Sequence, residues 1–553
     1  MEKIKRVLLG NEAIVKGAME AGVSYVSGYP GCPSAEIGQG FLDIAKKENI
    51  YAEWAVNEKV ALESAIGASF SGLKTLVNMK SFGINVCSDS LLPLAYTGTK
   101  GAMVIVVADD PSGHSSAQSE QDSRGYSLLS HIPTLEPVDP QECYEFTKLG
   151  FEISEKFNMP VILRITTRVA HQRAVVEFQN INPVTSTGLR KVGNFSRNPH
   201  QFCTMTPRVL EMKKELLEKI EKIRTFAEKS KVNQISGERV SAKLGVITYG
   251  VSHLHFLEVE KEMGLDLPVL KLGFFYPLPE KKIKAFLAGC KKVLVIEELE
   301  GHIEREIKIL AKNEGLKTEI LGKNLLPEIG ELNTEKVGLA LAKILGLKIK
   351  SLKNSLKIEN CELKIAKRYP RLCEGCPYWH VFPVIKAIAP DAIFGGDIGC
   401  NMIAGIPPHN MHDYLFCMGA SAGISHGVAK ATGQKVISIM GDGTFFHSGM
   451  PAVANAVYNK SKFLIVIVDN RITAMTGHQP NPGMGKTGMG EDTIEVVIED
   501  VVKSLGVKNV KTLDPINRTE LEDTVKDFLA KPEVSVIICK RICALLAKRQ
   551  KNG

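Results

Sequence analysis

The sequence predicts an α/β protein made of several doubly wound domains, each a parallel sheet covered by helices. Three observations carry this prediction: a length of 553 residues, an ordinary balance of 44% hydrophobic and 24% charged residues, and short apolar runs that alternate with helical patterns. The chain is too long for one hydrophobic core, since domains usually hold about 100–200 residues. Strands that alternate with helices indicate parallel sheets that are buried on both faces.

The alternation divides the chain into three α/β segments and one connecting segment. We expect a first domain at 1–185, a helical linker at 186–240, a second α/β domain at 241–347 and a third at 366–545. Inside the linker, Leu216, Ile220 and Ile223 have helical spacing among charged residues, which predicts a surface helix. A Lys-rich connection at 348–364 precedes the last domain.

Charge, hydropathy and cysteine content restrict the class of function. The net charge of +8 is spread along the chain without the aromatic and basic motif of a nucleic-acid module, which favours a solvated surface over nucleic-acid binding. No apolar stretch reaches the roughly 18 residues of a membrane span, and no signal peptide opens the chain, so we expect a cytoplasmic protein without membrane contact. The 12 cysteines then indicate reduced thiols or metal ligands rather than disulfides.

The strongest motif lies at the ends of two apolar runs, 435–440 and 463–468. Gly441-Asp442-Gly443-Thr444 follows the first run and Asn470 follows the second. In one strand-helix-strand unit the strands are parallel, so Asp442 and Asn470 reach the same carboxyl edge of the sheet. A carboxylate, an amide oxygen and phosphate oxygens suit Mg²⁺, and the glycines let backbone N–H groups approach a diphosphate. The alternative is a Gly-Asp-Gly turn with an unrelated asparagine.

Four stretches around this motif carry a family resemblance. They read GDIGC at 396–400, CMGAS at 417–421, GDGTFFHSG at 441–449 and TAMTGHQP at 473–480. They resemble the large (alpha) subunit of the indolepyruvate:ferredoxin oxidoreductases, which are thiamine-diphosphate-dependent 2-oxoacid oxidoreductases, and the similarity spans nearly the whole chain. The resemblance implies the thiamine-diphosphate-binding fold.

The resemblance also implies which residues hold the cofactor. Mg²⁺ would be held by Asp442, Asn470 and the main-chain carbonyl of Ile472. The residues expected to line thiamine diphosphate are Asp397, Ile398, Gly399, Cys400, Met418, Gly441, Asp442, Gly443, Thr444, Asn470, Ile472, Thr476 and Gly477.

A second stretch, EWAVNEKVALESAIG at 53–67, resembles the pyrimidine-binding segment of the same family. Thiamine chemistry needs a carboxyl group at the pyrimidine ring nitrogen. The resemblance places Glu58 there, with Glu63 as the reserve candidate. The alternative is a first-turn glutamate that the helix dipole stabilises, and the distant Gly-Asp-Gly motif favours catalysis.

The substrate side is predicted from two loops. The Gly- and Pro-rich stretch 28–36 follows a strand, where ligands sit in open α/β sheets. Family members usually carry Thr at the position of Cys32, so a hydroxyl that bonds a substrate carboxylate is replaced by a weak donor. In a second loop, His114 or Arg124 either pairs with an anionic substrate or forms a loop salt bridge.

The cysteines are candidates for the electron exit. Relatives of the indolepyruvate type end in a ferredoxin-like module with eight cysteines, and the chain reaches Gly553 without one, so we expect a separate ferredoxin or ferredoxin-like subunit. Cys373, Cys376 and Cys400 are placed much like three ligands of an iron-sulfur cluster, of the [4Fe-4S] type, in related pyruvate-type enzymes. The fourth ligand is open among Cys417, Cys539 and Cys543. The alternative is a tight turn with reduced thiols.

The leading hypothesis is the large catalytic subunit of an enzyme that converts indolepyruvate, or another aryl or branched-chain 2-oxo acid, and CoA into an acyl-CoA, with electrons passed to ferredoxin. A small (beta-type) subunit is the implied partner, in at least a homodimer or a heterotetramer. A non-oxidative decarboxylase or carboligase is one alternative, and a non-catalytic scaffold, which needs none of Glu58, Asp442 and Asn470, is another. The chain offers no early Gly-x-Gly-x-x-Gly for a Rossmann dehydrogenase.

Overall fold

The computed structural model describes residues 3–115, 118–179, 192–237, 242–347 and 370–552. Contacts group Met1–Cys361 as one compact unit and Glu362–Gly553 as another. The predicted boundaries at 185 and 240, the 348–364 connection and the start at 366 lie outside the described residues, so the division into domains remains a prediction. Among the described helices, none has both the length and the apolar character that crossing a bilayer requires.

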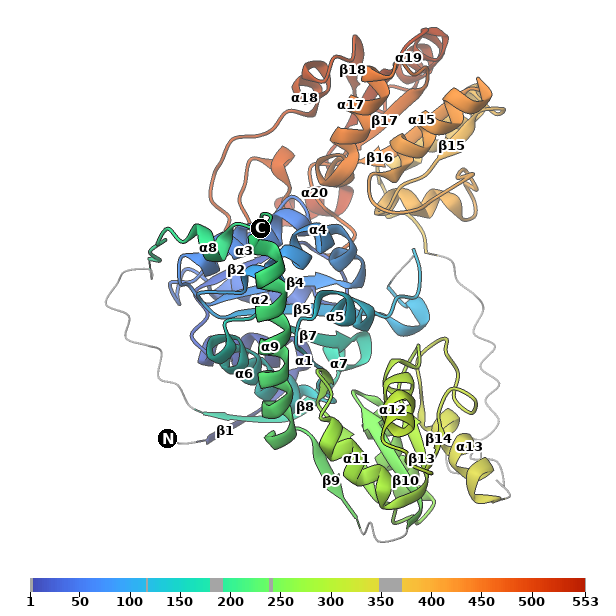
Figure 1. Cartoon of the computed structure of the whole chain (residues 1–553). Helices are drawn as coiled ribbons and strands as arrows, with labels where there is room; N and C mark the ends of the chain where they lie inside the picture. The colour runs from blue at the N-terminus through green and yellow to red at the C-terminus, as the bar shows by residue number, and fades with distance from the viewer. Residues whose placement is uncertain (1–2, 116–117, 180–191, 238–241, 348–369, 553) are drawn as a thin grey trace. The chain divides into compact units, whose positions relative to one another are not determined.

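The largest sheet belongs to the first unit (Figure 1). Its strands, in order across the sheet, are β12 (Phe274–Tyr276), β6 (Thr134–Leu135), β7 (Val161–Thr166), β5 (Met103–Asp109), β4 (Thr75–Lys80), β2 (Tyr25–Gly28) and β3 (Tyr51–Trp54). Neighbouring strands are parallel except for β12, which is antiparallel to β6. The apolar runs near 24, 75, 102 and 160 are strands as predicted. Every residue of β5 and β7 is buried, as expected for strands covered on both faces.

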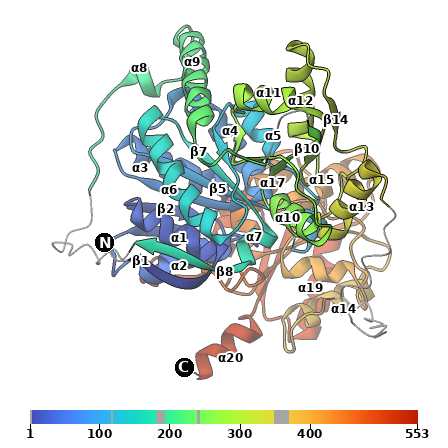
Figure 2. The ribbon, with the colours of Figure 1, turned by 90° about the horizontal axis from the view of Figure 1, so that it is seen from below.

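Helices follow most of these strands and cover the sheet. They are α1 (Gly10–Glu20), α2 (Ala35–Ile44), α3 (Glu58–Phe70), α4 (Ser81–Thr97), α5 (Arg124–Ser130), α6 (Pro140–Phe157) and α7 (Thr167–His171). α1 packs on α6, whereas α3 packs on α4. A separate antiparallel pair, β1 (Lys3–Leu9) and β8 (Arg173–Gln179), lies beside α1 (Figure 2).

The helix predicted inside the linker is α9 (Arg208–Lys229), which follows the short α8 (Pro199–Phe202). Its apolar stripe is buried and consists of Met212, Leu216, Ile220, Ile223 and Ala227. The helix contacts α4 and α6, and Figure 1 shows it running along this part of the first unit. The predicted helical spacing is confirmed, and α9 is one of the helices that cover the first sheet.

The second sheet of the first unit is formed by the next α/β segment. Its strands, in order, are β14 (Glu319–Leu321), β13 (Cys290–Ile296), β10 (Ala242–Tyr249), β11 (Val269–Leu272) and β9 (Gln234–Ser236). Only β9 runs antiparallel to its neighbour among these described strands. The helices are α10 (Ser252–Glu262), α11 (Glu280–Ala288), α12 (His302–Asn313) and α13 (Thr334–Leu345). Because β12 follows β11 but pairs with β6, this segment also contributes a strand to the first sheet.

The second unit holds one parallel sheet. Its order is β15 (Ile393–Gly395), β16 (Val436–Gly441), β17 (Leu464–Asp469), β19 (Ser535–Lys540) and β18 (Asn509–Leu513). Its helices are α14 (Tyr378–Ile388), α15 (Ala420–Thr432), α16 (Asp442–Thr444), α17 (Met450–Tyr458), α18 (Ile498–Ser504), α19 (Arg518–Ala530) and α20 (Ala544–Asn552). A π-helical turn, Phe445–Gly449, joins α16 to α17. The strand-helix-strand unit predicted around Asp442 is therefore present, with both strands parallel.

The packing of α9 leads to a stability prediction with a built-in control. Leu216 is 1% exposed, whereas its neighbour Leu217 is 45% exposed. We expect Leu216→Ala to destabilise the first unit by about 2–5 kcal/mol, because a buried leucine loses its contacts and leaves a cavity. Leu217→Ala should change the thermal unfolding midpoint little. Equal shifts for the two variants in calorimetry would mean that α9 is not packed as described.

Candidate functional site

The predicted diphosphate residues gather at the carboxyl edge of the second unit's sheet. Three neighbouring parallel strands end there: β15 before Asp397, β16 before Asp442 and β17 before Asn470. The register pairs Gly441 with Val468, so the residues that follow these strands emerge side by side. The expected meeting of Asp442 and Asn470 at one edge is confirmed, although they are 28 positions apart in the sequence.

Asp442 is 2% exposed and accepts a hydrogen bond from Asn481 Nδ2 at 2.9 Å. The backbone N–H groups of Gly443 and Ile472 favour the charged form of this carboxylate. Burial, and then the charge of Asp469, raise the pKa of Asp442 to about 7. Among the described residues, the charge with the largest effect on Asp442 is that of Asp469, which is also negative. Within this part of the chain, the site therefore lacks a positive charge to balance Asp442.

Asn470 and the loop that follows complete this edge. Asn470 is 6% exposed, and its Oδ1 accepts the N–H of Ile472 at 3.2 Å. Further along, Thr476 Oγ1 and Gln479 Oε1 lie 2.6 Å apart, and Gly477 has a φ of +124°, which favours glycine. Ile472, Thr476 and Gly477 therefore belong to one compact turn after β17.

Asp397 ties two of the predicted cofactor segments together. Its Oδ1 accepts the N–H groups of Ile398 at 2.8 Å and Gly419 at 3.0 Å, and its Oδ2 accepts the N–H of Ser421 at 3.1 Å. Burial raises the pKa of Asp397 to about 6, and these N–H groups oppose the rise. Met418 sits directly before Gly419, so Asp397 fixes the loop that carries it.

A hydroxyl and a glycine hold the Gly-Asp-Gly segment against the same loops. Thr444 Oγ1 donates to the carbonyl of Ile398 at 3.3 Å, close to Gly399 and Cys400. A Cβ on Gly419 would lie 2.6 Å from Ser448 Cβ, so only glycine allows this close approach. The cofactor residues predicted in the second unit thus form one continuous group of loops.

The oxygen atoms of this group fit a hard divalent cation. Asp442 offers a carboxylate, Asn470 an amide oxygen and Ile472 a main-chain carbonyl, which are donors that Mg²⁺ accepts. A cation would also offset the buried negative charge of Asp442. Among the described residues, no three side chains of the His, Cys, Asp and Glu types are placed to hold one metal ion, so the expected set depends on amide and carbonyl oxygens.

In the first unit, Glu58 and Glu63 lie in different surroundings. Glu58 starts α3, whose N-cap Asn57 accepts the N–H of Val60 at 2.9 Å, and it is 5% exposed. A Cβ on Gly83 would lie 2.7 Å from Glu58 Cγ, so this glycine lets α4 approach the carboxylate. The side chain of Glu63 is 46% exposed and bonds Ser90. Only Glu58 occupies a buried environment of the kind predicted.

The two substrate candidates of the second loop are separated. The side chain of His114 is 59% exposed, lies 3.8 Å from Glu331 and lines a pocket of about 490 Å³ at the carboxyl end of β7. Arg124 is 1% exposed and pairs with Asp122 at 3.1 Å and Glu136 at 3.0 Å. Arg124 is therefore enclosed and is not available to a substrate. Arg124 was predicted either to pair with an anionic substrate or to form a salt bridge, and in the structure it forms salt bridges.

Cys32 and its loop remain at the carboxyl edge of the first sheet. Cys32 is partly exposed, and Ser115 Oγ donates to its carbonyl at 3.4 Å, which joins this loop to the loop that follows β5. Burial, then the charge of Glu36, raise the pKa of the Cys32 thiol. His114 and Cys32 thus belong to adjoining loops.

Four cysteines of the second unit come together. Burial raises the pKa of Cys400 to about 12, and the charges of Cys376, Cys543 and Cys373 add to the rise, so these thiols lie near enough to affect one another's charge. The Cys373–Cys376 turn closes with a backbone hydrogen bond of 3.1 Å. The other two candidates have different surroundings, since Cys539 is buried in β19 and Cys417 is exposed. Of the three residues left open as a fourth ligand, Cys543 is the one whose charge acts on both Cys376 and Cys400.

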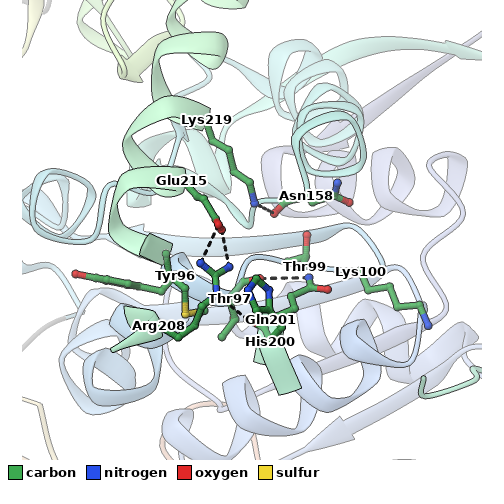
Figure 3. A pocket seen from close by; sticks show the side chains of 11 residues that line it. Tyr96, Thr97, Thr99, Lys100, Asn158, His200, Gln201, Arg208, Glu215 and Lys219 are labelled. Carbon is green, nitrogen blue, oxygen red and sulfur yellow. Dashed lines mark hydrogen bonds and ion pairs between the residues drawn. The ribbon is translucent and has the colours of Figure 1, made fainter. Parts of the chain in front are cut away.

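Another pocket, of about 290 Å³, lies at the opposite edge of the first sheet (Figure 3). It is lined by Thr97 to Lys100 before β5 and by Asn158 before β7, which places it at the amino ends of the strands. Its charged side chains already have partners in the protein. Arg208 donates two hydrogen bonds of 2.8 Å to Glu215, and Lys219 donates one of 3.5 Å to the carbonyl of Asn158. This pocket is separate from the loops that hold the predicted site residues.

Two residues of the site were not predicted from the sequence. Asn481 holds the carboxylate of Asp442, and its signal was only its position three residues after His478 in the quoted TAMTGHQP stretch. Tyr378 is 2% exposed, and burial raises its pKa, with further contributions from the charges of Cys400 and Asp442. It follows the Cys373–Cys376 turn directly, which was the available signal.

Comparisons with known proteins agree with this arrangement. Residues 397–539 match a family model described as thiamine pyrophosphate enzyme, C-terminal TPP binding domain. Residues 16–232 match one described as pyruvate flavodoxin/ferredoxin oxidoreductase, thiamine diphosphate binding. A solved structure, the 2-oxoglutarate:ferredoxin oxidoreductase from Magnetococcus marinus, is similar with a TM-score of 0.50 and 18% identity over 62% of this chain and 65% of its own, which concerns the fold alone.

Relatives found by sequence have a higher identity to this chain than that solved structure. The protein named indolepyruvate oxidoreductase subunit IorA from Methanothermobacter marburgensis is 42% identical over 97% of this chain and 87% of its own. The IorA from Thermococcus kodakarensis is 41% identical over 98% and 86%. Fold, site and domain matches define a thiamine-diphosphate-binding enzyme of the 2-oxoacid oxidoreductase class. Within that class, the chain belongs to the indolepyruvate oxidoreductase subunit IorA family, which confirms the resemblance found in the sequence.

The raised pKa of Asp442 gives a prediction about pH and metal. Its folded-state pKa of about 7 exceeds the roughly 3.9 of an unfolded aspartate, so ionisation is unfavourable in the folded protein. Metal-free protein should therefore lose stability as the pH rises from about 4 to about 7, and less so in Asp442→Asn. Thermal unfolding in a chelator at several pH values measures this difference, with the exposed Asp523→Asn as control. Identical pH profiles for wild type and Asp442→Asn would contradict the assignment.

Proposed function

We propose that this chain is the large catalytic subunit of an enzyme that oxidatively decarboxylates indolepyruvate or a related aryl or branched-chain 2-oxo acid. The observation that carries the proposal is membership of the IorA family over 97% of the chain, together with two buried carboxylates, Glu58 and Asp442, at strand ends. The alternatives of non-oxidative chemistry and of a silent scaffold are not favoured by the family.

The reaction balances with CoA as acyl acceptor. A 2-oxo acid anion and CoA thiol give an acyl-CoA thioester, CO₂, one proton and two electrons. The bond between the carboxylate and the 2-oxo carbon breaks, and a carbon-sulfur bond forms. The electrons pass one at a time to a ferredoxin or ferredoxin-like partner. When bound, thiamine diphosphate supplies the nucleophilic carbon and the electron sink that decarboxylation requires.

Residues of this chain have distinct tasks in the proposal. Asp442, Asn470 and the carbonyl of Ile472 would hold Mg²⁺, which would offset the charge of the diphosphate. The loops at 397–400, Met418, 441–444 and 476–477 would bind the cofactor through backbone groups. Glu58 would supply the carboxyl group that thiamine chemistry needs at the pyrimidine, and its burial would keep water away from that group. His114 and Cys32 lie on the substrate side.

We further propose that Cys373, Cys376, Cys400 and Cys543 hold one [4Fe-4S] cluster that receives the electrons first. A cluster spreads its four cysteine ligands over several iron atoms, so the thiols need not converge on one ion. Support comes from Cys376 and Cys400, because the charges of Cys373 and Cys543 contribute to the raised pKa of both thiols. Cys543 is also anchored beside the metal edge, because its N–H donates to the carbonyl of Asn470 at 3.0 Å.

Partners follow from the same chemistry. The IorA relatives are subunits by name, and we propose a small beta-type catalytic subunit as the partner of this chain, in a homodimer or heterotetramer. Anaerobic purification of the chain with that subunit, followed by assays of a panel of 2-oxo acids with CoA and a low-potential dye, tests the proposed function. CoA-independent release of an aldehyde would replace it with non-oxidative chemistry.

Glu58 gives the most direct prediction about catalysis. Glu58→Gln should keep most of its affinity for thiamine diphosphate but lose turnover by roughly 10²–10⁴-fold, because the amide cannot exchange a proton with the pyrimidine. Glu63→Gln is the matched control, since Glu63 belongs to the same helix but is exposed. Turnover by Glu58→Gln at the wild-type rate, or an equal loss in Glu63→Gln, would show that Glu58 has another role.

The cluster proposal is checked by iron content. Cys543→Ala should lose the iron and sulfide that copurify with wild type under anaerobic conditions, because one of four ligands is missing. Cys539→Ala removes a neighbouring buried thiol on β19 that faces Asp514 instead, and should retain iron. Iron-free wild type, or equal iron in the two variants, would contradict the proposed ligand set.

A further inference from the structure

The end of β4 places a lysine at the centre of the substrate edge. In the first sheet, β4 lies between β2, which leads into the Cys32 loop, and β5, which leads into the loop of His114. Lys80 is the last residue of β4. Because parallel strands end at one edge, Lys80 emerges between the two loops that were predicted from the sequence to meet the substrate.

The side chain of Lys80 is built into this edge. Its stem packs along the Cys32 loop, since a Cβ on Gly31 would lie 2.9 Å from Lys80 Cγ and Cδ. Its ammonium lies 4.6 Å from the centre of the Phe82 ring. Burial lowers the pKa of the Lys80 ammonium. The acidic groups of Asp110, Cys32 and Glu58 oppose this shift.

Asp110, whose charge acts most strongly on Lys80, makes its close hydrogen bonds to other described residues. Asp110 Oδ2 accepts the N–H and the hydroxyl of Ser115 at 2.6 and 3.0 Å, and its Oδ1 accepts the hydroxyl of Thr167 at 2.5 Å. Within the described part of the chain, the Lys80 ammonium makes its ring contact with Phe82 and no hydrogen bond or ion pair. A half-buried cation without a close anion is ready to take an anionic ligand.

We infer that Lys80 binds the carboxylate of the 2-oxo acid substrate, an inference that rests on the proposed function. The thiol of Cys32, on the loop beside Lys80, is a weak hydrogen-bond donor for a carboxylate. Lys80 lies against the same loop and supplies a full positive charge instead. It is then the residue that makes the site select a 2-oxo acid rather than a neutral carbonyl compound.

The test uses the complex of this chain with its partner subunit, loaded with Mg²⁺ and thiamine diphosphate. Lys80→Met should raise the KM for an aryl 2-oxo acid such as phenylpyruvate roughly 10- to 100-fold, the range expected for loss of one charged hydrogen bond, with a smaller effect on kcat. Lys80→Arg should restore part of the affinity. Lys59→Met, a change of the same type at an exposed lysine on α3 that pairs with Asp89, should leave KM unchanged.

Two further measurements separate the possible failures. Cofactor affinity and hydrogen-deuterium exchange at the thiamine C2 should be equal in wild type and Lys80→Met; a fall in exchange would mean that Lys80 acts on Glu58 and would overturn the inference. Phenylacetate should inhibit wild type better than neutral phenylacetamide, and Lys80→Met should lose this preference. If wild type is active and Lys80→Met has the same KM, the role of Lys80 is wrong but the proposed function stands. If wild type is inactive with every 2-oxo acid, both the proposed function and this inference are wrong.

Discussion

A parallel sheet sends the carboxyl ends of its strands to a single edge, because a returning helix separates each strand from the next. Both units of this protein depend on that constraint. In the second unit it brings Asp442 and Asn470 together from either side of a helical segment, and in the first it gathers the residues that follow β2, β4 and β5. Strands that are buried on both faces are mostly apolar along their length, so the predicted site residues lie mainly in the loops at this edge.

The constraint also explains how much could be predicted from the sequence. Apolar runs are local features, and they located the strands around Asp442 and the helical stripe of α9. Motif spacing was enough to expect Asp442 and Asn470 at one edge. The sequence could not predict which side chains pair with residues that are distant along the chain. Arg124 begins α5, directly after a stretch with the composition of a binding segment, yet its guanidinium bonds Glu136 and the carbonyl of Glu298, the latter at 2.9 Å and far along the chain.

The case of Arg124 shows why charge alone is a poor guide to ligands. Removing one partner of a buried ion pair costs about 3–5 kcal/mol, because the other charge is left in a medium that solvates it poorly. Arg124 and Arg164 share the buried carboxylates of Asp122 and Glu136, so each is committed to structure. Lys80 is the opposite case: it has three acidic groups nearby but no close ion pair. What distinguishes a structural cation from a ligand-binding one here is whether its counterion is already in contact, and sequence patterns do not reveal that.

In the second unit, the proposed cluster and metal sites share a wall. Tyr378 is buried between them, since the charges of Cys400 and Asp442 both act on it, and a Cβ on Gly441 would lie 3.2 Å from its hydroxyl oxygen. The backbone bond from Cys543 to Asn470 is a second direct link. Electrons that leave a cofactor held at this edge would therefore cross packed protein rather than water. Of the four cysteines, Cys373 is the exposed one, so a cluster held by them would be approached from the side of Cys373.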